Sequence, residues 1–301
     1  MYPTIFDFGT LPGPIPLPIA VHSYGLMMAL AFLTSMVITG RELARRGLDP
    51  QFASSVVLWI AVSGVIGAKL YSVVRIGDLS SLFASSGFVW YGGLMGGILG
   101  AAIAIHRSSN PFWVSFDVIL PIGLLGYGIG RIGCFLSGDG DYGPPSDLPW
   151  AMKFPNGTVS TLAANNTELV YLWQRKFPDV PVPADIPVHP TPLYEVGMVL
   201  IAFSLLWSLR TRTEGIPGCL AGITLILGGI ERFIAEFWRN PNSSPILFEP
   251  FKTAQIISIF LIIIGGIVIY WATHRQPVPV EEAEPPPAPT APPRRRRKRR
   301  R

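Results

Sequence analysis

Long apolar segments constrain the fold of this 301-residue chain more than any other feature. A helix needs about 20 mostly apolar residues to cross the hydrocarbon core of a bilayer, and seven segments come near that length. Charged residues make up only 14% of the chain, against about 25% in soluble proteins, which argues against a soluble domain. We therefore predict an all-α polytopic membrane protein with spans near 19–40, 53–74, 89–105, 115–136, 191–209, 217–237 and 254–273.

Basic residues follow alternate spans and predict the orientation of the chain. Arg45 and Arg46 follow the first span, Arg107 the third, Arg210 the fifth and Arg275 the last. These ends share one face, which the positive-inside rule assigns to the cytoplasm. The N-terminus is then expected outside and the C-terminus in the cytoplasm.

The connections divide the chain into a transmembrane part and a tail. Residues 1–275 are expected to form the membrane domain, and the long connection 137–190 is expected to form a small extracytoplasmic head with short strands or turns. Residues 276–301 are expected to be a disordered Pro-rich linker followed by a polybasic cytoplasmic tail. All eight residues of 294–301 are Arg or Lys, so the basic excess belongs to the tail and predicts no specific nucleic-acid partner for the fold.

A stripe of glycines marks the third span. Gly92, Gly96 and Gly100 recur every four residues and lie on one helix face. Small residues at this spacing allow another helix to approach the backbone closely. The stripe is equally consistent with room for lipid acyl chains beside a site.

Arginines inside two apolar segments indicate a polar site. Arg131 lies near the end of the fourth span, and Arg232, Glu236 and Arg239 follow at spacings of four and three in the sixth. On one continuous helix these three would share a face, with Glu236 paired to both arginines and Glu231 about 100° away. Intramembrane arginines usually mark a functional site, so the cluster is either a buried ion-pair network or a clamp for an anion such as a lipid phosphate.

Two further segments near the outer face carry polar groups. His189 and Glu195 lie where the head joins the fifth span, and they are either catalytic or tie the head to the helix. Tyr24 in the first span is either an interfacial aromatic residue or a hydroxyl donor to a lipid headgroup.

Five ordered motifs, together with this topology, resemble the prolipoprotein diacylglyceryl transferase family over about residues 19–273. The fourth-span motif is similar to the family's Gly-Arg-x-Gly-Asn-Phe-x-Asn-x-Glu, and the junction motif to its His-Pro-x-Gln-Leu-Tyr-Glu. The matching segments are Ser23-Tyr24-Gly25-Leu26-Met27, Tyr91-Gly92-Gly93-Leu94, Gly130 to Asp139, His189 to Glu195, and Arg232 to Arg239.

The resemblance implies an enzyme of the bacterial cytoplasmic (inner) membrane, a phosphatidylglycerol–prolipoprotein diacylglyceryl transferase without cofactor or metal. Its partners would be phosphatidylglycerol and prolipoprotein signal peptides with a lipobox cysteine. The diacylglyceryl group would pass to the cysteine thiol and glycerol-1-phosphate would leave. Arg131 and Arg232 would hold the phosphate, Glu236 would orient an arginine, and Arg239 and Tyr24 would complete the headgroup site.

The resemblance also implies substrate-binding roles for residues outside the arginine cluster. Gly143 would belong to the loop that gates substrate entry. Asp139 would keep the carboxylate of the family's glutamate on a shorter stem, although the loop is one residue longer here. Gly92, Gly93 and His189 match motif positions beside the substrate.

This chain departs from the family at the position of the general base. The family's histidine is replaced by Tyr91, whose ordinary pKa near 10 makes it a poor base for a thiol with a pKa near 8.5. The family's two asparagines are Cys134 and Ser137. We expect Tyr91 to orient a group by hydrogen bonding, with His22 or Glu236 assisting deprotonation. The alternative is a catalytically inactive homologue that binds phospholipid.

Overall fold

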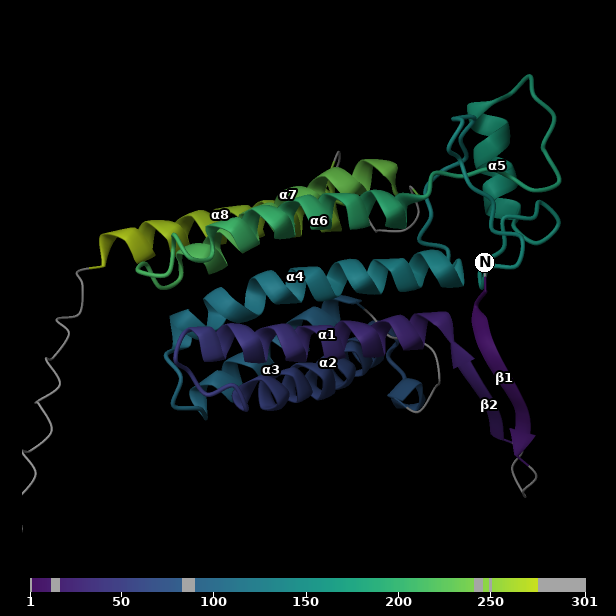
Figure 1. The fold of residues 1–301 in the computed structure, drawn as a ribbon. Coiled ribbons are helices and arrows are strands. Elements are labelled where there is room, and N and C mark those ends of the chain that lie inside the picture. Colours follow the sequence, from purple (N-terminus) through teal and green to yellow (C-terminus); the bar gives the residue numbers. More distant parts are fainter. Residues whose placement is uncertain (1, 12–16, 83–89, 241–245, 249–250, 276–301) are drawn as a thin grey trace, which may run out of the picture.

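A computed structural model describes residues 2–11, 17–82, 90–240, 246–248 and 251–275 of the chain. The predicted all-α polytopic architecture is confirmed (Figure 1). Within the described residues, five helices are long and apolar enough to cross a membrane: α1 (Ser23–Arg45), α2 (Phe52–Ile76), α4 (Phe112–Ser137), α6 (Thr191–Leu209) and α8 (Thr253–His274). The expected third and sixth spans are helices of 17 residues each, α3 (Trp90–His106) and α7 (Cys219–Ala235). The count of seven spans therefore stays a prediction, and the tail from residue 276 lies outside the described residues.

The start of the first span differs from the expectation. β1 (Thr4–Leu11) pairs antiparallel with β2 (Leu17–His22), so residues 19–22 belong to a strand. α1 begins only at Ser23 and continues to Arg45, beyond the expected end. A short apolar run does not by itself distinguish a strand from a helix start, which is why the sequence placed the boundary too early.

The helices form two layers that meet at α4 (Figure 1). α4 contacts α1 on one side and contacts α6 and α7 on the other. α3 packs on α2, and α8 packs on α7. The short elements are η1 (Leu79–Leu82), η2 (Glu236–Trp238), β3 (Ile246–Phe248) and β4 (Phe251–Lys252).

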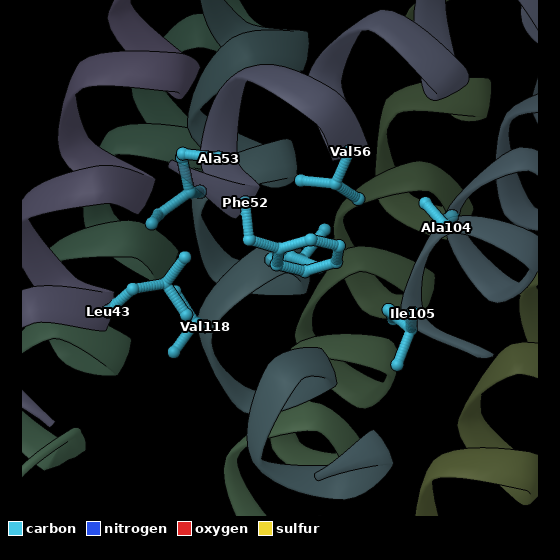
Figure 2. Packing of buried hydrophobic residues seen from close by; sticks show 10 residues of the cluster. Leu43, Phe52, Ala53, Val56, Ala104, Ile105 and Val118 are labelled. Carbon is cyan, nitrogen blue, oxygen red and sulfur yellow. The ribbon is translucent and has the colours of Figure 1, made fainter. Parts of the chain in front are cut away.

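An apolar cluster lies where α1, α2, α3 and α4 meet and holds these four helices together. Figure 2 shows Phe52 at the start of α2 beside Val56, with Leu43 from α1 and Val118 from α4 nearby. Leu43 and Val56 are fully buried, although many residues farther along these helices are exposed. This packing fixes α4 relative to α1 and α2.

The glycine stripe packs α3 against α2. A Cβ added to Gly96 would fall on the carbonyl oxygen of Ser63, and one added to Gly92 would fall on that of Gly67. Gly100 lies equally close to Ser63. The stripe therefore serves close helix packing, the first of the two readings above.

A buried carboxylate fixes α7 relative to α4. The Asp117 side chain on α4 accepts hydrogen bonds from the backbone N–H groups of Gly218 (2.8 Å) and Ala221 (2.7 Å) at the start of α7. Unpaired N–H groups at a helix start favour a negative charge there. Because α4 also carries Arg131 and α7 carries Arg232, this contact helps set the relative position of both arginines.

Residues 138–190 form a lobe at one end of the helices (Figure 1). Its apolar core contains Tyr142, Phe154, Leu169, Trp173, Ile186 and Val188. Isolated β-bridges join Met152 to Val188 and Leu162 to Asp185, in line with the expected short strands or turns. The helix α5 (Thr167–Lys176) was not expected; Asn166 caps it by accepting a hydrogen bond from the backbone N–H of Leu169 at 3.0 Å.

Candidate functional site

Three arginines from different parts of the chain converge on Glu195, which lies in α6 and is fully buried. Arg232 Nη1 lies 3.3 Å and Arg239 Nη1 lies 3.5 Å from Glu195 Oε1. Arg131 forms an ion pair with Glu195 Oε2, and Tyr127 donates a hydrogen bond to Oε1 at 3.3 Å. These contacts hold α4, α6 and α7 together around the buried carboxylate of Glu195.

Asp141 is a second centre of the same cluster. Arg131 Nη1 and Arg239 Nη2 each donate to one of its carboxylate oxygens at 2.6 Å. Burial alone would raise the pKa of Asp141, but the guanidiniums of Arg239 and Arg131 outweigh burial and hold the pKa below its usual value. Asp141 therefore stays ionised and bridges two arginines.

Glu236 extends the cluster toward α8. Arg232 Nη2 donates to Glu236 Oε2 at 2.7 Å, as the spacing on the helix predicts. The second partner of Glu236 is Lys252, whose Nζ lies 3.2 Å from Oε1. The expected pairing of Glu236 with Arg239 is therefore wrong, because Arg239 binds Asp141 and Glu195 instead.

The reason for this difference is the end of α7. The helix ends at Ala235, a single 3-10 turn follows over Glu236–Trp238, and Arg239 is extended. The carbonyl oxygen of Trp238 accepts a hydrogen bond from Thr191 Oγ1 at 2.6 Å, which fastens this turn to the start of α6. The sequence carries a signal that was not used: Pro241 disfavours helical backbone in the residue before it.

Polar atoms without partners lie inside the cluster. Among the residues that the structure describes, Arg131 Nη2, Arg239 Nε and Glu231 Oε1 are buried and have no hydrogen-bond partner. Arg131 Nη2 contacts Glu195 without the geometry of a hydrogen bond. Buried N–H groups without acceptors are costly, and Arg239 Nε, which has neither a hydrogen bond nor an ion-pair contact among the described residues, favours an acceptor supplied by a ligand.

Asp139 and Tyr24 lie beside the arginine cluster. Asp139 accepts a hydrogen bond from the backbone N–H of Asp141 at 3.1 Å, and no ion pair joins it to an arginine in the described part of the chain. Burial, together with the negative charge of Asp141, raises its pKa. Tyr24 is 44% exposed and packs its backbone and ring against Gly133 of α4. The substrate-binding roles of both residues stay predictions.

His189 ties the lobe to α6. Its Nδ1 lies 3.3 Å from the Tyr194 hydroxyl, which also accepts a hydrogen bond from Trp150 Nε1 at 2.8 Å. Burial lowers the pKa of His189, and the charge of Lys176 adds to the effect, so the ring is neutral at neutral pH. This arrangement fits the structural reading of His189.

The predicted glycine residues occupy two different places. Gly143 is buried where the lobe, α6 and η2 meet, and an added Cβ would fall on the Trp238 carbonyl oxygen. Gly92 and Gly93 face α2, and Gly93 lies next to Ala68. Tyr91 lies in the first turn of α3, and its side chain is outside the described residues. The substrate roles of these positions stay predictions.

Sequence reasoning did not assign three members of the cluster. The sequence identifies Glu195 as part of a motif whose role it leaves open, and in the loop after α4 the resemblance points to Asp139 and not to Asp141. Lys252 lies in β4, directly before α8, where nothing in the sequence indicated a contact with Glu236. Asp141 lies two positions after Asp139, and a loop that is only one residue longer does not by itself indicate it.

One group of possible metal ligands lies at this site. Cys134 Sγ and carboxylate oxygens of Asp139 and Asp141 lie within 4.8 Å of one another. However, Asp141 binds two guanidiniums, and Arg131 Nη1 donates to Cys134 Sγ at 3.2 Å. The arginines already provide the positive charge that a metal ion would bring, so this donor set fits an anion site better than a cation site.

Comparison with known proteins gives a consistent result. A family model described as prolipoprotein diacylglyceryl transferase matches residues 13–271. A phosphatidylglycerol–prolipoprotein diacylglyceryl transferase of Pectobacterium carotovorum is 31% identical over 289 residues, covering 92% of this chain and 95% of the relative. Proteins of the same name from Pseudomonas putida and Photorhabdus laumondii are each 30% identical, covering 86% and 94% of this chain and 92% and 96% of their own lengths.

Proposed function

This chain belongs to the prolipoprotein diacylglyceryl transferase family, and we propose that its arginine cluster binds the phosphate of phosphatidylglycerol during the transfer. The chain is a transferase that acts in lipoprotein maturation. The acceptor is the lipobox cysteine of a prolipoprotein signal peptide. A thioether forms between the thiol sulfur and the glycerol carbon, the carbon–oxygen bond to the phosphate breaks, and glycerol-1-phosphate leaves.

An unpaired donor carries the phosphate assignment. Arg239 Nε is buried and has no acceptor among the described residues, whereas Nη1 and Nη2 of the same side chain contact Glu195 and Asp141. Arg131 Nη2 forms no hydrogen bond either, although it lies in ion-pair contact with Glu195 Oε2. Guanidinium groups suit phosphate oxygens because several N–H groups lie in one plane. A phosphodiester oxygen would give Arg239 Nε an acceptor.

The charge of the cluster also fits one phosphodiester. Four cationic side chains, Arg131, Arg232, Arg239 and Lys252, are paired with three carboxylates, Asp141, Glu195 and Glu236. The excess of one positive charge matches the single negative charge of phosphatidylglycerol. The carboxylates also hold the guanidiniums in position before the lipid enters.

The same groups lower the barrier to transfer. The leaving glycerol phosphate gains negative charge as the carbon–oxygen bond breaks, and positive charge already in place stabilises the transition state more than the ground state. Arg131 and Arg232, from α4 and α7, are the residues we assign to this role. The nucleophile comes from the substrate, so Cys134, which is buried and free, need not react.

We also propose the orientation predicted from the sequence, with the site and the lobe on the outer side. Arg45, Arg46 and Arg210 gather around the buried Glu42, with contacts of 2.6, 3.3 and 3.6 Å. This basic cluster lies at the end of α1 that is far from the lobe, which supports a cytoplasmic position. Residues 1–275 then form the membrane domain.

A transfer assay tests the phosphate site. With labelled phosphatidylglycerol and a lipobox peptide in nanodiscs, Arg131→Ala and Arg232→Ala should each reduce transfer by about 100-fold or more, as loss of a transition-state charge partner does. The control is Arg212→Ala, an exposed arginine after α6, which should transfer label at the wild-type rate.

Two outcomes would contradict the proposal in different ways. Normal transfer by both arginine variants would show that the phosphate does not bind at this cluster. If the wild-type protein binds phosphatidylglycerol but transfers no label to the peptide, the result would instead support the inactive, phospholipid-binding alternative.

A further inference from the structure

Glu231 is a buried acidic residue that the mechanism above does not use. It precedes Arg232 in α7 and is only 4% exposed. The sequence placed it about 100° from the arginines, yet it interacts electrostatically with Glu195 and Arg131 as well as with Arg232 and Arg239. It therefore lies at the edge of the arginine cluster and within its electrostatic field.

Glu231 has no ionic partner despite these neighbours. Within the described residues, no basic side chain lies within 4.0 Å of its carboxyl group, and its Oε1 has no hydrogen-bond partner. The guanidinium of Arg232, the next residue, is directed at Glu195 and Glu236 instead. The arginines therefore pair with the other carboxylates of the cluster and not with Glu231.

This environment disfavours the ionised form of Glu231. Transfer of an unpaired carboxylate from water to a buried site is very costly, and a group in that position binds a proton instead. Glu195, which is fully buried and in contact with three arginines, adds like-charge repulsion. Both effects act in the same direction.

The proton on Glu231 decides the net charge of the site. With Glu231 neutral, the cluster keeps its excess of one positive charge. With Glu231 ionised, the four cations would face four carboxylates and the excess would vanish. A monoanionic phosphodiester would then enter a site with no net attraction for it.

We propose that Glu231 holds a proton in the resting protein and thereby sets the charge of the arginine cluster to accept one monoanionic phosphodiester. It is a positioning residue that acts through the electrostatic field, and it need not touch the lipid. The inference rests on the proposed phosphate site and adds to it the control of charge selectivity.

The neighbouring groups do not replace Glu231 in this role. Tyr127 of α4 interacts electrostatically with Glu231 and donates a hydrogen bond from its hydroxyl to Glu195 of α6. The cations that act on Glu231 are Arg131 of α4, Arg232 of α7 and Arg239 beyond η2; a guanidinium does not lose its proton in proteins. A variant of Glu231 alone separates its effect from that of Lys252, which pairs with Glu236.

The test measures binding of phosphatidylglycerol to the purified protein in phosphatidylcholine nanodiscs, without peptide, from about pH 7 to about pH 10, where arginine charges do not change. Wild-type affinity should fall on the order of tenfold as Glu231 ionises, because one negative charge is added near the phosphate. Glu231→Gln, which imitates the neutral acid, should bind like the wild type at neutral pH and lose much less affinity at high pH. Glu214→Gln, in the connection between α6 and α7, where it pairs with Arg45 at the end of α1, is the matched control and should follow the wild type.

Infrared spectroscopy gives a second readout that a purely structural role would not produce. The wild-type protein should show the carbonyl band of a protonated carboxylic acid that disappears at high pH and is absent from Glu231→Gln. Identical pH profiles for wild type and Glu231→Gln, or the absence of this band from wild type at neutral pH, would overturn the inference. Failure of the phosphate site itself is recognised separately, because Arg131→Ala would then bind phosphatidylglycerol normally.

Discussion

At the scale of single residues, two aspartates in one loop have opposite roles. Asp141 joins Arg131 to Arg239 and has a pKa below its usual value, whereas Asp139 binds a backbone N–H group and has a raised pKa. Only Gly140 separates the two residues in the sequence. The difference arises because only Asp141 faces the guanidinium groups.

We predict that Asp141→Asn destabilises the protein by about 2 kcal/mol, the scale of hydrogen bonds to charged groups, and strongly reduces transfer. Asp139→Asn is the matched control and should cost less. Because the folded-state pKa of Asp141 is lowered, its ionisation stabilises the fold above the unfolded pKa of about 3.9. The difference in unfolding free energy between wild type and Asp141→Asn should therefore persist at neutral pH and shrink as acid protonates Asp141.

Thermal unfolding in detergent at several pH values measures this difference. An effect of Asp139→Asn as large as that of Asp141→Asn would show that the bridge between the two arginines is not what stabilises this loop.

The sequence predicted the arginines of the site better than their partners. Arg131 and Arg232 were identified because a charge inside an apolar segment is costly and therefore informative. Glu195 lies in the predicted fifth span and carries the same signal, but the three arginines that contact it are distant in sequence, so its partners could not be predicted. Arg239 was assigned to the correct cluster but with the wrong partner, because helical spacing was extended past the end of α7.

At the scale of elements, apolar length predicted the helices, but close contacts depend on individual glycines. Gly96 and Gly97 are neighbours in α3 with different surroundings. A Cβ on Gly96 would fall on the Ser63 carbonyl oxygen, which cannot move without α2, whereas a Cβ on Gly97 would meet Ile60 Cγ2 at an ordinary 3.5 Å. The four-residue spacing of the glycines predicts the stripe on α3, but it does not predict how closely α2 approaches each glycine.

We predict that Gly96→Ala destabilises the protein by about 1–3 kcal/mol, the usual cost of overpacking, and that Gly97→Ala is close to neutral. Thermal unfolding and the yield of folded protein measure the effect. Equal stability of the two variants would contradict the close approach of α3 to α2.

The β1–β2 hairpin and α5 lie beyond what apolar length could indicate. β2 is apolar and runs directly into α1, so the hydropathy signal merges the strand with the helix. α5 is a short helix whose apolar residues Leu169 and Trp173 pack into the lobe, and it lies in a connection that read as turns.

At the scale of the whole molecule, the arginine cluster bridges the two layers of helices. Arg131 is carried by α4, which packs on α1, whereas Glu195 and Arg232 are carried by α6 and α7 in the other layer (Figure 1). The sequence could predict which segments are apolar helices but not which of them meet. Separation of the layers would therefore break the contacts of the site before it unfolded either layer.

The shortness of α7 carries a consequence for the surrounding bilayer. Its 17 residues span about 26 Å, less than the hydrocarbon thickness of about 30 Å. Such a mismatch favours local thinning or tilt next to the helix that holds Arg232. We expect turnover in vesicles of matched charge to decline as acyl chains lengthen, and the same rate at every chain length would show that the membrane does not adapt to α7. Membrane thickness would then be a condition of catalysis, set by the lipids from which the substrate itself is drawn.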